Sequence, residues 1–434
     1  MSKSLHIRKL VGVGLVFFAA SGLTAVDTDT ARLIQKKISQ IEPEIIRIRR
    51  FIHMNPELGN REFETAKLIA SKLLALGLDV ETGVAHTGVV GVLHGDLPGE
   101  TVAVRADMDA LPIQELTSVS FKSLNTGIMH ACGHDMHTAI VLGTAYVLSS
   151  MKARIKGRIK FIFQPAEEGS PTGEEGGASL MIKEGVLQNP DVKAIFGLHV
   201  WPEDVGRILF APGAVMAASD GFSVTVKGKS AHGARPHEGI DAVAISAHII
   251  VNIHSMISRF TDATDPSVVS VGTINGGSRS NIIADSVSFE GTIRTLSEKN
   301  RNKIRLLIED IVRGTTRTYG AEYEFVYRKG TPPLYNHPEL AKILEPTIHS
   351  VLGSENVLPL QAQMVSEDFA SYGLQIPGFY FFLGVKNPAK TTTPPLHSPY
   401  FNPDERAIPI GIKVLSHILL DSLDYQSRSH RDLF

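Results

Sequence analysis

The chain has 434 residues, enough for two domains, and its 43% hydrophobic and 20% charged residues are typical of a globular protein. The formal net charge of −2 at pH 7 excludes the strongly basic surface typical of proteins that bind nucleic acids or anionic membranes. We therefore expect no nucleic-acid partner.

The first 25 residues have the pattern of a secretory signal peptide. Three basic residues precede an apolar run over 10–20, and small residues follow. A membrane-spanning helix needs about 20 apolar residues, so an uncleaved anchor is the less favoured alternative. The sequence predicts cleavage after Ser21 or Ala25, export to the periplasm or medium, and no stable membrane insertion afterwards.

Helical and strand patterns alternate through the first half of the chain. Isoleucines at three- and four-residue spacing predict a helix over 30–52, and a second helix is predicted over 62–76. The next predicted elements are the helix 138–149 and the strands 88–93, 101–105, 158–163 and 194–200. This alternation predicts an α/β fold in which helices flank a mixed central sheet, with sites at the carboxyl ends of strands.

The pattern changes near residue 218, which predicts an inserted α+β domain. Short segments there alternate apolar and polar residues around predicted helices over 240–260 and 298–319. The α/β pattern then returns with a helix over 339–351, a strand over 378–383 and a helix over 408–423. We predict a split catalytic domain over 26–217 and 333–425, an inserted lid or dimerisation domain over 218–332, and a mobile tail over 426–434.

The densest group of metal-ligand residue types is HACGHDMH, residues 130–137. Thiolates and neutral imidazoles suit Zn²⁺ and neighbouring transition metals, and Cys132 and His134 can both leave one face of an extended turn. Cys132 is the only cysteine, so an intramolecular disulfide is impossible. The alternative for a lone cysteine, a small buried hydrophobe, is weakened by the three neighbouring histidines.

Three further segments add ligand types. Glu167 and Glu168 follow a predicted strand in PAEEG, where one carboxylate could bind metal while the other handles protons. His199 ends another predicted strand, and His397 follows a proline-rich stretch. Taken singly, each is as easily a solvated acid or a structural histidine. Together with Cys132 they complete a coordination sphere.

These motifs, with RADMDALP (105–112), AHGARPHEGIDAV (231–243) and SEDFA (366–370), resemble the N-acyl-amino-acid amidohydrolases. This group of dinuclear zinc-peptidase relatives includes hippurate hydrolases, auxin-conjugate hydrolases and N-acetyl-diaminopimelate deacetylases. The resemblance runs from about residue 44 to the last helix. It implies two divalent ions per subunit, Zn²⁺ or Mn²⁺ with Co²⁺ or Ni²⁺ as alternatives. The implied ligands are a bridging Cys132 and His134, Glu168, His199 and His397.

The resemblance also implies catalytic roles. Glu167 would serve as general base and then acid for a water shared by the two ions, and His232 of the insert would stabilise the oxyanion. Asp107 occupies the position of a metal-binding histidine in wider relatives. We predict that Asp107 and Asp109 orient the ligands, the alternative being a solvated strand end.

The implied substrate carries a free carboxylate. Asn281 and Arg294 resemble the carboxylate-binding positions of the wider group, and Arg235 is a third candidate. The alternative is an ordinary polar loop and a strand arginine. Substrate contacts on the insert imply that it closes as a lid, with hinges near Ser219 and Pro332.

The sequence therefore predicts a metal-dependent hydrolase that cleaves N-acyl-L-amino acids to a carboxylic acid and a free amino acid. The main alternative is a metallo-exopeptidase or dipeptidase with the same metal site. A non-catalytic periplasmic binding protein is a remote alternative, because it has no need for the ligand set or for Glu167. A purely structural zinc site disagrees with the carboxylate ligand. A homodimer through the insert is a further expectation.

Overall fold

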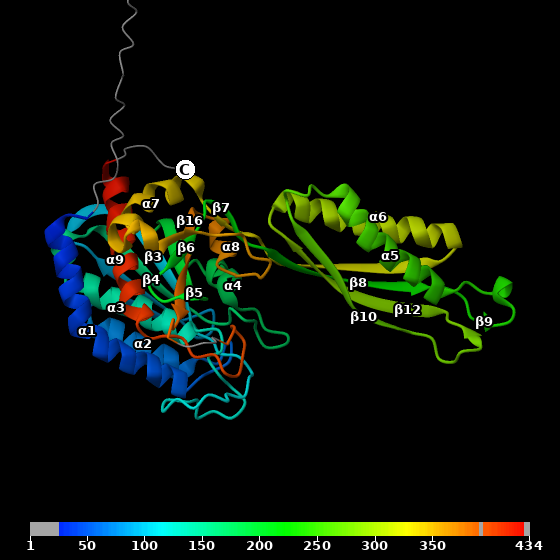
Figure 1. The fold of residues 1–434 in the computed structure, drawn as a ribbon, viewed down its shortest axis with the longest axis horizontal. Helices are drawn as coiled ribbons and strands as arrows, with labels where there is room; N and C mark the ends of the chain where they lie inside the picture. The colour runs from blue at the N-terminus through cyan, green and yellow to red at the C-terminus, as the bar shows by residue number, and fades with distance from the viewer. Residues whose placement is uncertain (1–25, 390–393, 429–434) are drawn as a thin grey trace, which may run out of the picture.

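The computed structural model describes residues 26–389 and 394–428 (Figure 1). The predicted signal peptide, residues 1–25, lies outside these residues, as do 429–434. The predicted start of the tail at residue 426 is wrong, because the last helix, α9 (Ala407–Arg428), continues to Arg428. Tyr425 packs against the core and holds the last turns of this helix in place.

A mixed eight-stranded sheet forms the centre of the larger lobe, as the sequence predicted. Its parallel pairs are β3 with β4 and β5, β5 with β16, and β6 with β15, whereas β1, β2 and the β6–β16 contact are antiparallel. In spatial order the strands are β1 (Asp79–Val84), β2 (Gly88–His94), β4 (Lys156–Gln164), β3 (Leu97–Asp107), β5 (Val192–Asp204), β16 (Gly378–Lys386), β6 (Ile208–Phe210) and β15 (Val357–Pro359).

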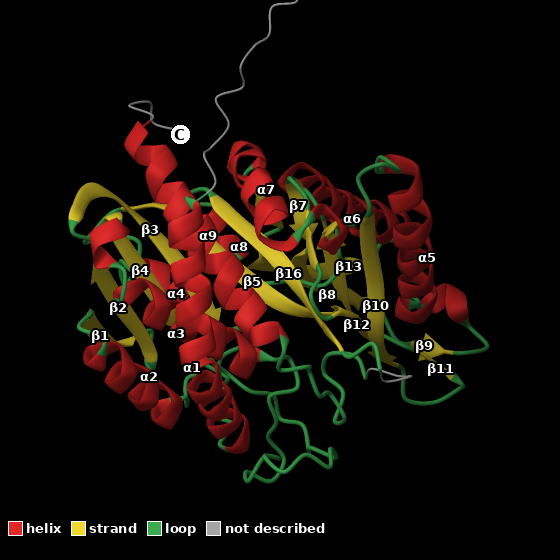
Figure 2. Cartoon of the chain, turned by 60° about the vertical axis from the view of Figure 1, so that its left-hand side comes forward, coloured by secondary structure: helices red, strands yellow, loops and turns green. Residues whose placement is uncertain are grey.

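Helices cover both faces of this sheet. Successive strand residues point to opposite sides, and those on both sides are apolar and buried. Val102 and Val104 of β3 belong to the larger core, whereas Ala103 between them belongs to the smaller one. The helices α1, α3 and α9 lie across the first face (Figure 2). Helices of the first face are α1 (Thr28–Met54), α2 (Phe63–Ala75), α3 (His134–Ser149), α7 (Pro338–Leu352) and α9; those of the second are α4 (Gly177–Lys183) and α8 (Ala370–Gly373).

The inserted segment forms a second lobe with a core of its own (Figure 1). Isoleucines at 245, 249, 253 and 257 bury one side of α5 against the sheet, and the side chain of Asp241 caps this helix by accepting from two backbone N–H groups. In spatial order the sheet comprises β10 (Ser267–Gly276), β12 (Ser286–Thr295), β8 (Ala218–Lys227) and β13 (Glu322–Thr331), and its helices are α5 (Ala242–Phe260) and α6 (Glu298–Tyr319).

The two strands that connect the lobes lie side by side. Ser219 of β8 pairs with Thr331 of β13 at the base of the insert. Asp220 accepts hydrogen bonds there from the Arg301 guanidinium, the Tyr327 hydroxyl and the backbone N–H of Gly330. This pairing holds together the two points at which the chain passes between the lobes. Two small ribbons complete the fold, β7 (Gly213–Met216) with β14 (Leu334–Asn336), and β9 (Ala231–His232) with β11 (Ile282–Ile283).

Candidate active site

The site residues meet where parallel strands end. Because β3, β4 and β5 run parallel, their carboxyl ends lie at one edge of the sheet. Asp107 is the last residue of β3, the Glu167–Glu168 pair follows β4, and His199 lies in the second half of β5. His134 begins α3, and Cys132 and His397 lie in loops, so one helix, three strands and two loops supply the site.

All five predicted ligand residues come together in one cluster. The Cys132 Sγ atom lies 3.3 Å from His199 Nε2 and 3.3 Å from His397 Nε2. Glu168 Oε1 lies 3.1 Å from His397 Nε2 and 4.0 Å from His134 Nε2. Overlapping groups with ligand atoms within 4.8 Å of one another share these five residues.

Two buried polar atoms in the cluster have no hydrogen-bond partner, as expected for atoms that bind a metal ion. His134 Nε2 and Glu168 Oε1 are buried, and neither takes part in a hydrogen bond of acceptable geometry. Such orphaned polar atoms are costly unless an ion or other partner satisfies them. Separations of 3 to 4 Å between donors also fit atoms that share an ion at about 2.0 to 2.3 Å each. The donor set therefore fits divalent metal.

The histidine hydrogen bonds aim the free ring nitrogens into the cluster. His134 Nδ1 lies 2.9 Å from the Asp109 carbonyl oxygen, and His199 Nδ1 lies 2.6 Å from the Val200 carbonyl oxygen. A carbonyl can only accept, so both Nδ1 atoms carry a proton, which leaves Nε2 as the atom that presents a lone pair in each neutral ring. Burial also lowers the pKa of His199 to about 3, which keeps this ring neutral.

The Cys132 thiol needs a cation to ionise. It is buried, and burial raises the pKa of this thiol well above its usual range. A thiolate is the form that binds metals, and a bound divalent ion lowers a thiol pKa strongly. Cys132 is therefore suited to metal binding, whereas a buried thiol of raised pKa would be a poor nucleophile.

Of the two predicted supporting aspartates, Asp109 contacts two ligand residues directly, whereas Asp107 contacts His137. Asp109 Oδ1 lies 3.2 Å from His134 Nδ1, and Asp109 Oδ2 accepts from the backbone N–H of Glu168. Asp107 Oδ1 accepts from His137 Nδ1 at 2.6 Å. Both carboxylates are almost fully buried, so the alternative of a solvated strand end does not hold for them.

The other ionisable residues of HACGHDMH, His130, Asp135 and His137, are buried around the ligand cluster. His137 uses both ring nitrogens, since Nε2 accepts from the Val200 backbone N–H while Nδ1 donates to Asp107. Asp135 lies beneath the site, 2.8 Å from both Arg49 Nε and His53 Nδ1. His130 is buried among these groups, where burial lowers its pKa to about 3. The contacts of His137 and Asp135 assign these two residues to the support of the site, whereas both ring nitrogens of His130 are buried without a hydrogen-bond partner.

Glu167 stands at the edge of the ligand cluster within a second group of acids. Glu167, Glu367 and Asp368 have carboxylate oxygens within 4.8 Å of one another. Burial raises the pKa of Glu167 well above its usual range, and the negative charges of Glu367 and Asp368 add to this rise. A carboxylate with a raised pKa is a stronger base, which suits a role in proton transfer.

Sequence reasoning assigned no role to Glu367, Asp368 or the arginine that joins them to the site. Arg105 is fully buried and lies 2.7 Å from Asp107 Oδ2, 3.1 Å from Glu367 Oε1 and 2.7 Å from Asp368 Oδ1. The only signal was the presence of charged residues in RADMDALP and SEDFA. Nothing in one sequence tells which of those charges meet.

The predicted residues of the insert fall into two places. Arg294 lines the cavity beside the ligand cluster. His232, Asn281 and Arg235 are exposed and lie together at the far end of the insert, by β9, where Gly233 N donates to the Asn281 carbonyl and Arg235 N donates to that of His232 (Figure 1). These three do not line the cavity, so their roles stay predictions.

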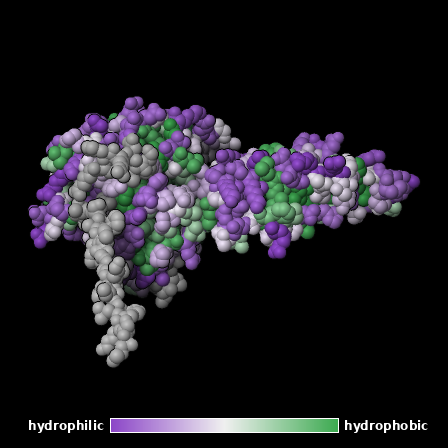
Figure 3. All heavy atoms as spheres, turned by 90° about the horizontal axis from the view of Figure 1, so that it is seen from above, coloured by the Kyte–Doolittle hydropathy of each residue, from purple (hydrophilic) through white to green (hydrophobic). Residues whose placement is uncertain are grey.

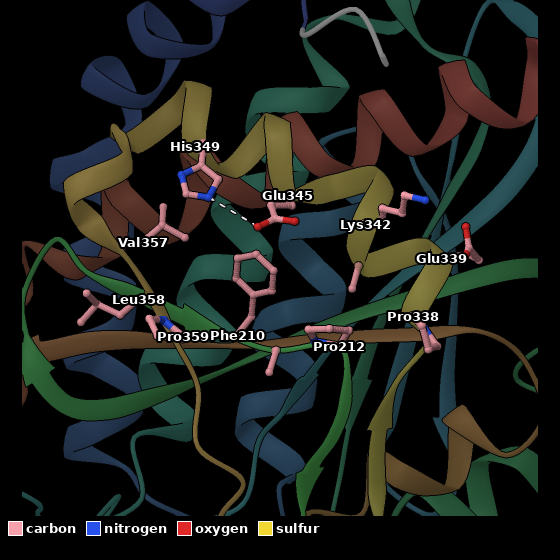
Figure 4. Close-up of a pocket in the computed structure, with 12 residues that line it drawn as sticks. Phe210, Pro212, Pro338, Glu339, Lys342, Glu345, His349, Val357, Leu358 and Pro359 are labelled. Atoms are coloured by element: carbon pink, nitrogen blue, oxygen red, sulfur yellow. Dashed lines mark ion pairs between the residues drawn. The ribbon is translucent and has the colours of Figure 1, made fainter. Parts of the chain in front are cut away.

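A cavity of about 620 Å³ opens beside the ligand cluster and reaches the base of the insert. One wall carries ligand residues and Glu167; the other carries Ser219, Arg294 and Thr331. A second cavity of about 600 Å³ lies between α7 and β15 (Figure 4). Its lining includes an ion pair between His349 and Glu345 at 3.8 Å, but none of the metal-type clusters among the described residues. The chemistry therefore belongs to the first cavity.

Comparison with known proteins gives concordant matches. Residues 103–421 match the model of peptidase family M20/M25/M40. The chain is 42% identical over 401 residues to thermostable carboxypeptidase 2 of Saccharolobus solfataricus, covering 90% of this chain and 98% of that protein. It is 40% identical over 311 residues to the N-acyl-L-amino acid amidohydrolase of Geobacillus stearothermophilus, covering 71% and 82% respectively. A dinuclear metal-binding peptidase of the M20 family from Bacillus subtilis superposes with a TM-score of 0.76 at 32% identity, covering 89% of this chain and 99% of that one.

Proposed function

The chain belongs to peptidase family M20/M25/M40, and from this membership we propose that it hydrolyses N-acyl amino acids to a carboxylic acid and a free amino acid. It is a metal-dependent hydrolase of amide bonds, and the resemblance inferred from its motifs is confirmed. The observation that carries the substrate proposal is one cavity lined by four of the five ligand-type residues (Cys132, Glu168, His199 and His397), by an acid of raised pKa and by a cationic group for a free carboxylate.

The proposed ligands are Cys132, His134, Glu168, His199 and His397, for two divalent ions. Mixed sulfur, nitrogen and oxygen ligands suit Zn²⁺ or Mn²⁺, with Co²⁺ or Ni²⁺ as alternatives. When bound, such ions polarise the scissile carbonyl and lower the pKa of a water molecule. Asp109 orients two of the proposed ligands through its hydrogen bonds to His134 and to the backbone of Glu168.

Glu167 is the proposed proton carrier. It takes the proton from the attacking water and returns it to the leaving nitrogen, so that the amine departs neutral. The backbone N–H of Asp368 lies 3.4 Å from Glu167 Oε1, and this contact limits rotation of the carboxylate. The proposed base thus has a fixed direction as well as a raised pKa.

Arg294 is the proposed partner of the substrate carboxylate. Its Nη1 atom is buried without a hydrogen-bond partner, and burial lowers the pKa of the guanidinium. A carboxylate would satisfy this free donor through a charge-assisted hydrogen bond. A substrate with a free carboxylate on the amino-acid side therefore fits the insert wall of the cavity.

His232 is the proposed oxyanion donor, with Asn281 and Arg235 beside it. Because these residues lie at the far end of the insert, they would reach a cavity only through closure of the insert or from a second copy of the chain. The edge strand β10 supports the second route, since most of its residues are exposed and no strand of the described residues pairs with its outer edge.

The outer face of α5 also supports a homodimer. It exposes Val243, Val251 and Phe260, and hydrophobic residues interrupt the hydrophilic surface of the insert (Figure 3). Within the described residues, α5 is the one helix whose length and composition would suit a membrane span, but its other side fills the core of the insert. Sedimentation of the chain, and of a variant with proline at Val271 in β10, tests the dimer.

We also propose that the chain is exported and that residues 1–25 are removed. The basic and apolar pattern of that segment supports this proposal. N-terminal sequencing of protein from the secreting host would test it, with a new amino terminus after Ser21 or Ala25 as the expected result. An intact Met1 on exported protein would contradict the proposed cleavage.

A substrate panel tests the reaction. N-acetyl amino acids, N-benzoylglycine and free dipeptides are offered to enzyme with added Mn²⁺ or Zn²⁺, to chelated enzyme and to Glu167→Gln. Metal-dependent cleavage of the N-acyl compounds, lost in the variant, is expected. Cleavage of dipeptides alone would favour the metallo-exopeptidase alternative, to which the carboxypeptidase relative lends weight. The non-catalytic alternative has no support in the family membership.

A further inference from the structure

One part of the lining of the active-site cavity is apolar. It includes the side chains of Trp201, Met216, Met364 and Leu396, next to the proposed metal ligands. Trp201 is the only tryptophan in the chain. An apolar wall beside a polar reaction centre binds a part of the substrate that takes no part in the chemistry, so it bears on selectivity.

The indole ring of Trp201 is held rigidly before any ligand arrives. It stacks on the Phe382 ring with centroids 4.3 Å apart and planes 20° apart, and Phe382 is fully buried on β16. Trp201 stands two residues after His199 on β5, so both side chains leave the same face of that strand. Their ring centroids are 6.3 Å apart. The indole of Trp201 is therefore the nearest aromatic neighbour that the cavity lining offers to His199, a proposed ligand.

The carboxylate end and the acyl end of the substrate should bind to different parts of the cavity lining. The scissile amide has to lie between the ligand residues and Glu167, and the insert wall offers the free Arg294 donor to the carboxylate. The Trp201 wall belongs to the catalytic lobe and offers no charge. The end of the substrate that carries no charge is the acyl group.

We propose that Trp201 determines acyl selectivity, and that the acyl group this enzyme prefers is a flat aromatic one rather than acetyl. This inference rests on the proposed function. An aromatic ring can stack on or against the fixed indole and contact the polarisable methionine sulfurs. The methyl of an acetyl group would leave most of these apolar side chains uncovered. No chemical step changes; the indole acts through binding alone.

Three substrates separate the possible uses of this wall. N-benzoylglycine carries its ring on the acyl side, N-acetylphenylalanine carries it on the amino-acid side, and N-acetylglycine has none. For wild-type enzyme we expect kcat/KM to be highest for N-benzoylglycine. In Trp201→Ala, the ratio of kcat/KM for N-benzoylglycine to that for N-acetylglycine should fall about tenfold, consistent with a lost aromatic contact and lost apolar area.

Matched variants control this measurement. Trp201→Phe keeps a flat ring and should keep most of the ratio, whereas Trp201→Leu keeps apolar volume without a flat ring and should lose it. Phe51→Ala removes an exposed aromatic side chain from α1, outside the cavity, and should leave the ratio unchanged. If Trp201→Ala lowered the rate with N-acetylphenylalanine and spared N-benzoylglycine, the wall would serve the amino-acid side chain and the proposal would be overturned.

The single tryptophan also reports binding without turnover. Benzoate, the acyl product, should change the fluorescence of Trp201 saturably in metal-loaded enzyme, whereas acetate and phenylalanine should not. A change with phenylalanine alone, or none with benzoate, would overturn the acyl assignment. The two proposals fail differently: cleavage of no N-acyl amino acid would overturn the proposed function, while cleavage with an unchanged ratio in Trp201→Ala would overturn only the role of Trp201.

Discussion

The buried carboxylate of Glu62 accepts a 2.9 Å hydrogen bond from the backbone N–H of Ala166, the residue before Glu167. Ala166 has a φ of +53°, in the left-handed region, which costs a residue with a Cβ about 1 to 2 kcal/mol. Asp109 accepts from the backbone N–H of Glu168 on the other side of Glu167. Two buried carboxylates thus hold the strained turn that directs Glu167 and Glu168 into the site.

Removal of the Glu62 carboxylate should loosen this turn. In Glu62→Ala the Ala166 N–H loses its acceptor, and we expect a loss of about 1 to 3 kcal/mol in the free energy of unfolding. Chemical denaturation measures this loss, and kcat should fall more than KM changes, because Glu167 is displaced. Thr87→Val removes another hydrogen bond of Glu62 but keeps the one to Ala166, so it should retain kcat. An unchanged kcat in Glu62→Ala would contradict the positioning role.

The same carboxylate predicts a pH dependence of stability. Burial raises the pKa of Glu62 to about 7, with the Asp109 charge adding to the rise. Between its ordinary value of 4.5 and 7, the native state binds more protons than the unfolded state, so stability falls as the pH rises through this window and has lost this contribution above 7. Glu62→Gln cannot ionise. The melting temperature of this variant relative to wild type should therefore be higher at pH 8 than at pH 5, and the opposite trend would disprove the assignment.

Replacement of Glu167 should separate catalysis from metal binding. For Glu167→Gln we expect kcat to fall about 100- to 10,000-fold, because the amide cannot carry the proton. The metal content by elemental analysis should stay at the wild-type level, since the five proposed ligands remain. Glu168→Gln is the matched comparison, and it should lose metal as well as activity. Equal metal loss in both variants would place Glu167 among the ligands instead.

Loss of the Cys132 thiolate should weaken the metal site. Cys132→Ala should bind fewer divalent ions per chain than wild type and show a much lower kcat. Wild-type enzyme that is first chelated and then given Mn²⁺ or Zn²⁺ should recover its activity. Because Cys132 is the only cysteine, alkylation of the native protein reports this site alone. Bound metal should slow that alkylation; equal rates with and without metal would argue against Cys132 as a ligand.

Arg294 should matter only for substrates with a free carboxylate. In Arg294→Ala, kcat/KM for an N-acyl amino acid should fall about 10- to 100-fold, as expected for the loss of a charge-assisted hydrogen bond of about 1.5 to 3 kcal/mol. The corresponding N-acyl amino-acid amide should be affected much less. Arg328→Ala removes an arginine from β13 of the same sheet, outside the cavity, and should alter neither substrate. An equal loss for acid and amide would show that Arg294 has only a structural role.

The sequence predicted the elements well because their signals are local. The isoleucine rows of α1 and α5 and the alternation in β8 and β12 each show within one element which side will be buried. The ligand set was also predictable in kind, since Cys132 and His134 lie two residues apart and the other ligand types stand at strand ends or in loops. Two predicted site residues of the insert show where prediction from sequence ends: Arg294 lines the cavity, whereas His232 does not.

The sequence by itself determined the secondary structure, the mixed α/β class and the residue types available for metal. Only the tertiary structure decided which of those residues meet. Arg105 reaches Asp368 across 263 residues of sequence, and Glu62 supports Ala166 across 104. Trp201 gains its rigidity from Phe382 on the neighbouring strand. These contacts depend on the order in which the strands pair, and that order is set by burial summed over the whole sheet rather than by any local pattern.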